Sequence, residues 1–200
     1  MASAATLTTL QGRVQNLVMD TGAGIFPTAT IQEGVRLALE EYNAHRPQDI
    51  IGVRTPSSAN KELSLSALTG LLDVRKVWFP YTSATPEDPP RELTDWMIHW
   101  DAGVPKLYLG DSAFSPGGAD VARIFYVIPH TLNGLDSATT STFPAIDDGL
   151  LVLGGAGYAC IARGVDLSET AANMAVTTPN LAAIGEAFLS QFRKRLGADD

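Results

Sequence analysis

One stretch decides the fold of this chain, residues 128–169, which read IPHTLNGLDSATTSTFPAIDDGLLVLGGAGYACIARGVDLSE. A polar run rich in Thr and Ser gives way, after Pro144, to an apolar segment that begins at Asp147 or Asp148. Carboxylates are favoured at a helix N-terminus because the helix dipole is positive there. We therefore predict a helix from this point, preceded by a polar loop or an extended arm.

The predicted helix is unusually rich in very small residues. Gly154, Gly155 and Gly157 fall within four positions, and each interior glycine costs a helix roughly 1 kcal/mol relative to alanine. This cost indicates that another element packs very close to the helix. That element is either another helix of the same core or a neighbouring subunit, and the sequence leaves both possibilities open.

Two amphipathic helices are predicted upstream, because apolar residues recur there at three- and four-residue spacing. The first runs from Leu7 to Val18 and ends in a glycine-containing loop at 22–24. The second is predicted to begin with a capping box, Thr30–Glu33, and to stop before Pro47. Together these segments form an αα-hairpin at the start of the chain.

From Asp49 onward the pattern becomes that of short strands, rich in β-branched and aromatic residues and separated by Pro, Gly and Ser clusters. The predicted strands are residues 50–54, 62–67, 71–79, 96–100, 106–109 and 121–128. The region 48–130 is therefore predicted to form a small antiparallel β-lobe.

A last helix is predicted with Thr178 as its N-cap, Pro179 at its first position and Gly197 at its end. The fold class is then α+β: a helical layer of two N-terminal and two C-terminal helices, with an inserted small antiparallel β-lobe. The expected domains are residues 1–47 with 145–200, the lobe 48–130, and a linker or extended arm 131–144.

Composition and charge limit the function. The chain has 14 basic and 22 acidic side chains and a net charge of −8, with no basic stripe of the kind that binds phosphates. An acidic surface can instead repel a DNA strand that slides past it. The N-terminus does not resemble a secretory signal, and the longest apolar run, 150–162, is too short to span a membrane. Cys160, without a second cysteine, is expected to be reduced and buried.

Motifs that could carry chemistry do not have the required context. Asp20-Thr-Gly matches the loop of aspartic proteases, but a helical stripe runs directly into it, so a helix C-terminus is expected. The segment Gly154–Gly157 has neither the GxGxxG spacing nor the GK[ST] ending of a phosphate loop. The histidines, His45, His99 and His130, lack metal-ligand spacing. We predict no catalytic residue, no cofactor and no metal.

The order of these segments resembles a known family. The strand Arg123–Tyr126 leads into His-Thr-Leu-x-Gly-Leu (130–135), a Thr-rich run, Pro and two acidic residues. A small-residue helix with Tyr-Ala-x-x-Ala-Arg (158–163) and a short Asp-Leu-Ser-Glu turn (166–169) follow. This layout, over about 140 residues, resembles the head–tail connector proteins of tailed bacteriophages, the adaptor or head-completion group. The β-lobe departs from the simpler, almost wholly helical members.

The resemblance implies a structural virion protein rather than an enzyme. It implies a ring of about twelve subunits in the neck of the virion, made in the host cytoplasm, which joins the portal to a stopper or tail-completion protein and lets DNA pass without specific binding. Rings require two different patches on each subunit. The expected subunit interface is Gly154, Gly155, Gly157, Tyr158, Thr139, Thr140 and Thr142. The expected portal contact is Phe192, Arg193, Lys194 and Arg195. The resemblance implies no membrane partner.

Three alternatives remain open at this point. The first is another tail-completion or baseplate protein whose β-lobe binds a partner. The second is a hydrolase that uses a cleft of the lobe, with Asp101, Asp111 or His99 as acid and base. The third is a ligand-binding module in which Trp96 and Trp100 form a stacking platform.

Overall fold

The computed structural model describes residues 1–20, 22, 24–56, 61–82, 91–110, 121–174 and 180–197, without the side chains of 168–174. The chain forms two compact units, one from Met1–Pro47 together with His130–Asp200 and the other from Gln48–Pro129. Each unit has its own core of buried apolar residues. The fold is α+β, as the sequence predicts.

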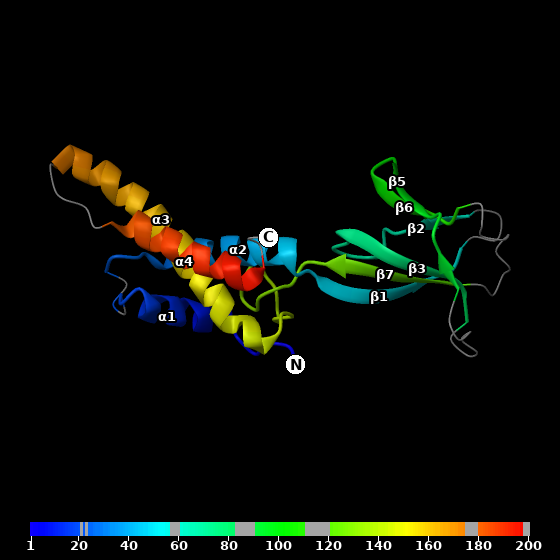
Figure 1. Cartoon of the computed structure of the whole chain (residues 1–200), viewed down its shortest axis with the longest axis horizontal. Helices are drawn as coiled ribbons and strands as arrows, with labels where there is room; N and C mark the ends of the chain where they lie inside the picture. The colour runs from blue at the N-terminus through cyan, green and yellow to red at the C-terminus, as the bar shows by residue number, and fades with distance from the viewer. Residues whose placement is uncertain are drawn as a thin grey trace. The chain divides into compact units, whose positions relative to one another are not determined.

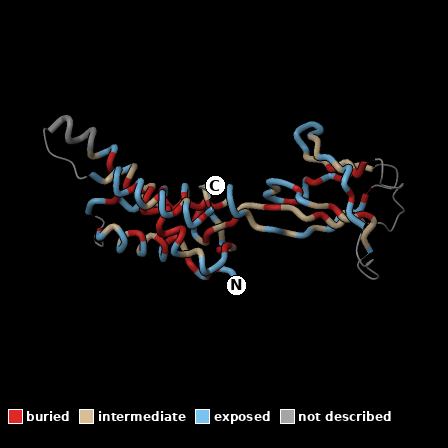
Figure 2. The backbone as a smooth tube through the Cα atoms, in the orientation of Figure 1, coloured by how far each residue is buried: buried red, intermediate tan, exposed pale blue. Residues whose placement is uncertain are grey.

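The helical unit contains α1 (Leu7–Leu17), α2 (Thr28–His45), α3 (Asp148–Met174) and α4 (Leu181–Leu196) (Figure 1). A short 3-10 turn, η1 (Ala145–Asp147), precedes α3. The other three helices all pack against α3, and Figure 2 shows buried positions along the surfaces that these helices turn toward one another. The window Ala145–Leu167 is long and apolar enough to cross a membrane, but 61% of its most apolar part is buried inside the protein, as in a core helix.

The loop between α1 and α2 is held by a buried carboxylate. Met19, at the end of α1, adopts the left-handed conformation with φ 57°, and its N–H bonds back to the carbonyl of Asn16. The carboxylate of Asp20 then accepts the backbone N–H groups of Gly24, Ile25 and Phe26. These hydrogen bonds, chiefly that from Phe26, lower the pKa of Asp20 although burial opposes them. Asp20 therefore serves the end of a helix, as predicted.

Three predicted boundaries are wrong. Helix α2 begins at Thr28 after Pro27, so Thr30–Glu33 is not a capping box, and Glu33 pairs with Arg36 instead. Helix α3 continues through 166–169, which the sequence placed in a turn. Helix α4 begins at Leu181 with Asn180 as its N-cap; Thr178 and Pro179 lie outside the described residues.

Residues 130–144 lie against the helical unit in this structure. Leu132, Leu135 and Phe143 are buried in its core. The Ser141 hydroxyl donates to the carbonyl of Ala5 at 2.6 Å. The backbone N–H of Leu7 donates to Asn133. The segment thereby ties the N-terminus of the chain to the start of α3.

The β-unit contains two sheets. In the four-stranded sheet the order is β1 (Gln48–Arg54), β7 (Val121–Ile128), β3 (Asp73–Tyr81) and β4 (Glu92–Leu93). In the three-stranded sheet it is β2 (Glu62–Ser64), β6 (Val104–Tyr108) and β5 (Met97–Asp101). All strand pairs are antiparallel. Each of the six predicted strands overlaps an observed one, and β4 is additional.

Candidate functional site

The glycines of α3 admit other helices of the same chain. A methyl group added to Gly34 of α2 would lie 2.5 Å from the carbonyl oxygen of Gly155. Likewise, a methyl group on Gly185 of α4 would lie 2.7 Å from the carbonyl oxygen of Gly157. Backbone thus meets backbone on both sides of α3.

Gly154 has the same kind of surroundings. A methyl group there would lie 2.9 Å from the Ala38 side chain and 3.1 Å from the ring of Phe192. Gly154, Gly155 and Gly157 are all buried within the helical unit. Packing within one core, which the sequence left as one of two explanations, accounts for these contacts. The subunit interface proposed below therefore does not include the three glycines.

One side of α3 remains uncovered. Tyr158, Ile161, Ala162 and Val165 follow one another at i, i+3, i+4 and i+7, so they share one face of the helix. Tyr158 and Ile161 are half-buried, Ala162 is exposed, and 55% of Val165 is exposed. We call these four residues the open stripe. Tyr158 is the residue of the predicted helical interface that belongs to it.

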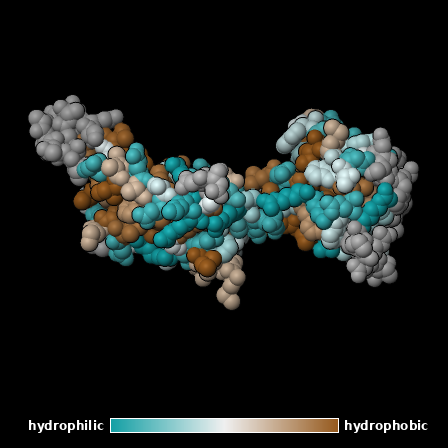
Figure 3. All heavy atoms as spheres, in the orientation of Figure 1, coloured by the Kyte–Doolittle hydropathy of each residue, from teal (hydrophilic) through white to brown (hydrophobic). Residues whose placement is uncertain are grey.

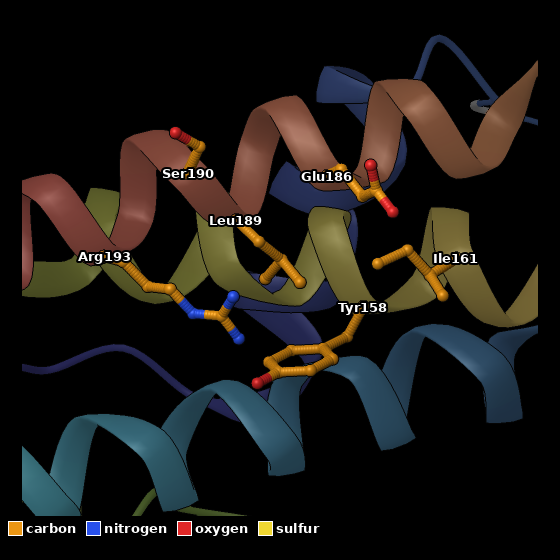
Figure 4. A pocket seen from close by; sticks show the side chains of 6 residues that line it. All are labelled: Tyr158, Ile161, Glu186, Leu189, Ser190 and Arg193. Atoms are coloured by element: carbon orange, nitrogen blue, oxygen red, sulfur yellow. The ribbon is translucent and has the colours of Figure 1, made fainter. Parts of the chain in front are cut away.

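Helices α2 and α4 flank the open stripe, and α1 lies behind α3 (Figure 4). α1 meets α3 from the other side, where Gly155 faces Val14. Cys160 also lines a hollow there with Leu17 and Val18. At about 100° per residue, Cys160 falls roughly opposite the open stripe, whereas Gly155 falls only about 60° from Tyr158, between α1 and α2. The helical unit thus has a front, formed by α2, α3 and α4, and a back that carries α1.

The front face contains two furrows separated by Tyr158. The larger, about 620 Å³, is lined by Tyr158, Ile161, Glu186, Leu189, Ser190 and Arg193 (Figure 4). The smaller, about 330 Å³, is lined by Ala29, Thr30, Glu33, Gly34, Leu37, Tyr158 and Ala162. The side chain of Tyr158 forms the ridge between them.

A polar cluster closes one end of this face. Arg193 Nε of α4 donates to Glu41 Oε1 of α2 at 2.6 Å, and the Tyr158 hydroxyl of α3 donates to Glu41 Oε2. Burial acts to raise the pKa of Glu41, but the hydrogen bonds from Arg193 and Tyr158 outweigh it, so this pKa lies below its usual value. The carboxylate is thus held ionised and joins three helices.

The residues predicted to contact the portal differ in accessibility. Phe192 is fully buried against Gly154, and Arg193 is engaged with Glu41. Lys194 and Arg195 are exposed in the last turn of α4. The structure therefore leaves Lys194 and Arg195 as the accessible members of this group.

The predicted threonines line one part of the segment 130–144. Thr139 and Thr140 are exposed, and Thr142 is half-buried. The Thr142 hydroxyl lies 3.1 Å from Nδ1 of His130 and accepts the N–H of Thr131. Burial lowers the pKa of His130 below its usual 6.5. Thr142 thus supports the chain locally, whereas Thr139 and Thr140 face solvent.

Two residues of the enzyme alternative, His99 and Asp101, are alternate residues of β5 and belong to one surface charge network with Glu62 and Lys106. Asp101 pairs with Lys106, which lowers the pKa of Asp101 chiefly through its hydrogen bond. His99 Nε2 lies 3.6 Å from Glu62 Oε1. Asp111 lies outside the described residues. Nowhere in the described part of the chain do three His, Cys, Asp or Glu side chains gather in a way that could hold a metal ion.

The ligand-binding alternative required Trp96 and Trp100 to share a platform. Trp96 packs against the core of the β-unit, whereas 71% of Trp100 is exposed. The two rings therefore have different environments, and only Trp100 is freely accessible.

A surface that sequence reasoning missed lies on the four-stranded sheet. The Arg123 guanidinium lies 5.3, 5.0 and 5.5 Å from the ring centres of Trp78, Tyr81 and Phe125. Arg123 Nη1 also donates to the Tyr81 hydroxyl at 2.8 Å. The alternation of Arg123 and Phe125 along β7 was the available signal, because alternate residues of a strand share a face.

No protein-family model matches this chain, and no curated protein sequence matches it. Chains of solved structures are similar to it in part, among them the following two. One is a chain in the neck of an empty GTA particle computed with C6 symmetry, with TM-score 0.31 and 12% identity over 79% of this chain and 82% of that one. The other is in the neck of a native GTA particle computed with C12 symmetry, with TM-score 0.30 and 13% identity over 79% of this chain and 81% of that one. Scores this low do not establish a common fold, so the proposals below rest on the residues of this chain.

Proposed function

We propose that the protein is a structural subunit of the neck of a tailed-phage particle, a head–tail connector without enzymatic activity. Its subunits form a ring, about twelve in number by the family resemblance, between the portal and the stopper or tail-completion protein. The ring is part of the virion, and its subunits are made in the host cytoplasm.

The observation that carries the proposal is the open stripe of α3. The motif Tyr-Ala-x-x-Ala-Arg, on which the resemblance partly rests, places Tyr158 and Ala162 on this stripe and turns Ala159 into the core. Val165 extends the stripe, with 55% of its surface exposed. An apolar strip between two helices is typical of a surface that another helix covers. One residue of the motif, Ala159, therefore packs in the core, while Tyr158 and Ala162 contribute to the surface proposed for assembly.

The charge of the chain supports a passive role toward DNA. The net charge is −8, and the basic residues on α4 that remain accessible, Lys194 and Arg195, stand together at its C-terminal end. We assign Lys194 and Arg195 to the portal contact. An acidic channel wall would let DNA slide through because like charges repel.

The test is assembly with purified portal protein of the same phage. We expect negative-stain electron microscopy to show rings with a central channel, alone or capping the portal. We expect Lys194→Glu combined with Arg195→Glu to abolish portal binding while leaving the fold intact. A chain that remains monomeric with and without portal, or that processes a substrate, would rule the proposal out.

A second candidate is a tail-completion or baseplate protein that binds its partner through the β-unit. The cluster of Arg123 with Trp78, Tyr81 and Phe125 favours it, because Trp, Tyr and Arg dominate the binding energy of protein interfaces. If the protein is a tail-completion or baseplate protein, Arg123→Ala would abolish partner binding. If it is a ring-forming connector, Arg123→Ala would leave ring formation unchanged.

A further inference from the structure

The front face of the helical unit has an excess of negative charge around its apolar stripe. Glu186 forms no ion pair with any residue that the structure describes, and Glu33 shares Arg36 with Asp136. Arg193, which also borders this face, is already neutralised by Glu41. A partner for this face therefore needs apolar side chains and few or no carboxylates of its own.

The back of the helical unit meets this description. Helix α1, Leu7–Leu17, contains no acidic residue and one basic residue, Arg13. Its C-terminal end presents apolar side chains, with Leu17 40% exposed and Met19 91% exposed. Figure 3 shows hydrophobic residues gathered at the end of the helical unit where α1 ends and α4 begins. A hollow of about 220 Å³ lies there.

Met19 has a left-handed backbone conformation that no contact of its side chain within the monomer explains. Its φ of 57° is the left-handed cap of a helix, where glycine or asparagine is normally found because a Cβ atom is strained there. The side chain buries almost nothing in the monomer, since 91% of it is exposed. The neighbouring Asp20 fixes the loop through three N–H bonds. An apolar side chain is thus presented to solvent at a strained backbone position, next to a carboxylate that binds the backbone of residues 24–26.

We propose that the back of one copy, α1 with Leu17 and Met19, docks on the open stripe of α3 in the next copy. This inference rests on the ring proposed above. Front and back lie on opposite sides of α3, so each copy offers one to each neighbour and the contact is heterologous, as ring closure requires. The acid-free α1 complements the carboxylates of Glu33 and Glu186. Leu17 and Met19 enter the furrows beside Tyr158.

Two blocking variants test the contact. Val165→Glu blocks the front, and Met19→Glu blocks the back; both positions are exposed in the monomer, so folding is preserved. Val165→Leu and Met19→Leu are the matched apolar controls. Alone, each glutamate variant loses all species larger than the monomer in sedimentation velocity, while the leucine controls assemble as the wild type does.

Mixing the two glutamate variants gives the sharpest result. Val165→Glu retains an intact back and Met19→Glu an intact front, so one productive contact remains between them. The mixture therefore forms a 1:1 dimer and nothing larger. A mixture that stays monomeric while the wild type assembles would overturn the inference.

Cross-linking covers the case in which wild-type contacts are weak in solution. A variant with Gly12→Cys and Ala162→Cys carries one thiol on α1 and one on the open stripe. Position 12 has open space around it, and Cys160 is buried with its pKa raised to about 11, so the native thiol reacts poorly. A short bismaleimide gives a ladder of covalent oligomers, whereas either single variant has no thiol on the other side of the contact and stays monomeric.

The two proposals fail in different ways. If the wild type forms rings, both glutamate variants also form them and cross-linking gives no ladder, the front-to-back contact is wrong. The proposal that the protein forms a ring is then unaffected. If the wild type forms no rings with portal present and the variant with Gly12→Cys and Ala162→Cys gives no ladder, both proposals fall. Met19→Gly adds a check on folding: it relieves the strained backbone, so we expect a higher melting temperature of the monomer together with weaker assembly.

Discussion

At the scale of single residues, the glycines show how tightly the helices of this chain approach. Gly34 and Gly185 each face a backbone carbonyl of α3, where no side chain can move aside. We expect Gly34→Ala and Gly185→Ala each to lower the free energy of unfolding by about 1–3 kcal/mol, the usual cost of overpacking. Urea unfolding followed by circular dichroism measures the change.

Gly12 is the matched control, because it lies in α1 with nothing within 4 Å of an added methyl group. Gly12→Ala should raise the free energy of unfolding by up to about 1 kcal/mol through helix propensity. A loss of stability at position 12 equal to that at position 34 would show that close packing is not the cause.

The sequence predicted that something packs close to Gly154, Gly155 and Gly157, because their cost to the helix is visible in it. It could not say whether the neighbour was the same chain or another copy. The answer depends on Gly34 of α2 and Gly185 of α4, and nothing in the local sequence marks these two glycines as partners of α3.

His130 gives stability a dependence on pH. Its pKa is lowered by burial below the usual 6.5. In the unfolded chain the imidazole of His130 takes up a proton near pH 6.5, whereas in the folded chain it does so only at a lower pH. The free energy of unfolding therefore falls as pH drops below 6.5. We expect His130→Gln to flatten this part of the curve. Unfolding midpoints measured above and below pH 6.5 report the effect.

Glu41 also makes stability depend on pH, but in a separate and more acidic range. Its pKa is lowered below the usual 4.5, so its contribution to stability is lost only as pH falls below that value. Measurements kept above pH 4.5 therefore isolate His130. An unchanged slope in His130→Gln would show that another group controls the pH dependence.

At the scale of elements, the sequence predicted the strands well and the helix ends less well. Strand residues such as those of β7 alternate and are flanked by turn residues, so both type and position are readable. The start of α2 was misplaced because Thr30 and Glu33 have the spacing of a capping box, yet Pro27 fixes the chain three residues earlier. Local signals compete at helix ends, and tertiary contacts decide between them.

The open stripe was missed for a different reason. Helix α3 is apolar on nearly every side, so the stripe of Tyr158, Ile161, Ala162 and Val165 overlaps the residues that face the core. Periodicity reveals a face only when the opposite face is polar. Which side of such a helix is left uncovered depends on where α1, α2 and α4 pack, and this is not encoded locally.

The cluster of Glu41, Tyr158 and Arg193 joins α2, α3 and α4, and we expect it to stabilise their arrangement. Arg193→Met leaves the largely buried Glu41 carboxylate without its cation and should cost about 1–2 kcal/mol; Tyr158→Phe should cost about 1 kcal/mol. Thermal unfolding of the single and double variants measures both. Strictly additive losses would contradict the shared carboxylate, because groups in one network couple.

At the scale of the whole molecule, the two units have separate cores. The β-unit enters and leaves through paired residues, since Gln48 lies opposite Ile128 in the β1–β7 ladder. We expect a variant in which a short Gly-Ser loop replaces 48–129 to keep a folded helical unit. Circular dichroism and a cooperative melting curve provide the measurement.

The same variant separates the roles of the units. If front and back of the helical unit form the ring contact, rings persist without the β-unit, and electron microscopy will show them. Rings that disappear while the helical unit stays folded would assign the contact to the β-unit instead.

The discontinuity of the helical unit also has a consequence during synthesis. α1 and α2 are made before the helix on which both pack, because α3 begins about 100 residues after the end of α2, beyond the β-unit. At about 5–20 residues per second this delay lasts roughly 5–20 seconds. Throughout it, Val14 and Val35, which face Gly155 in the finished protein, have no partner. The nascent hairpin is therefore a natural client for chaperones, and slow translation of the β-unit should lower the yield of folded chain.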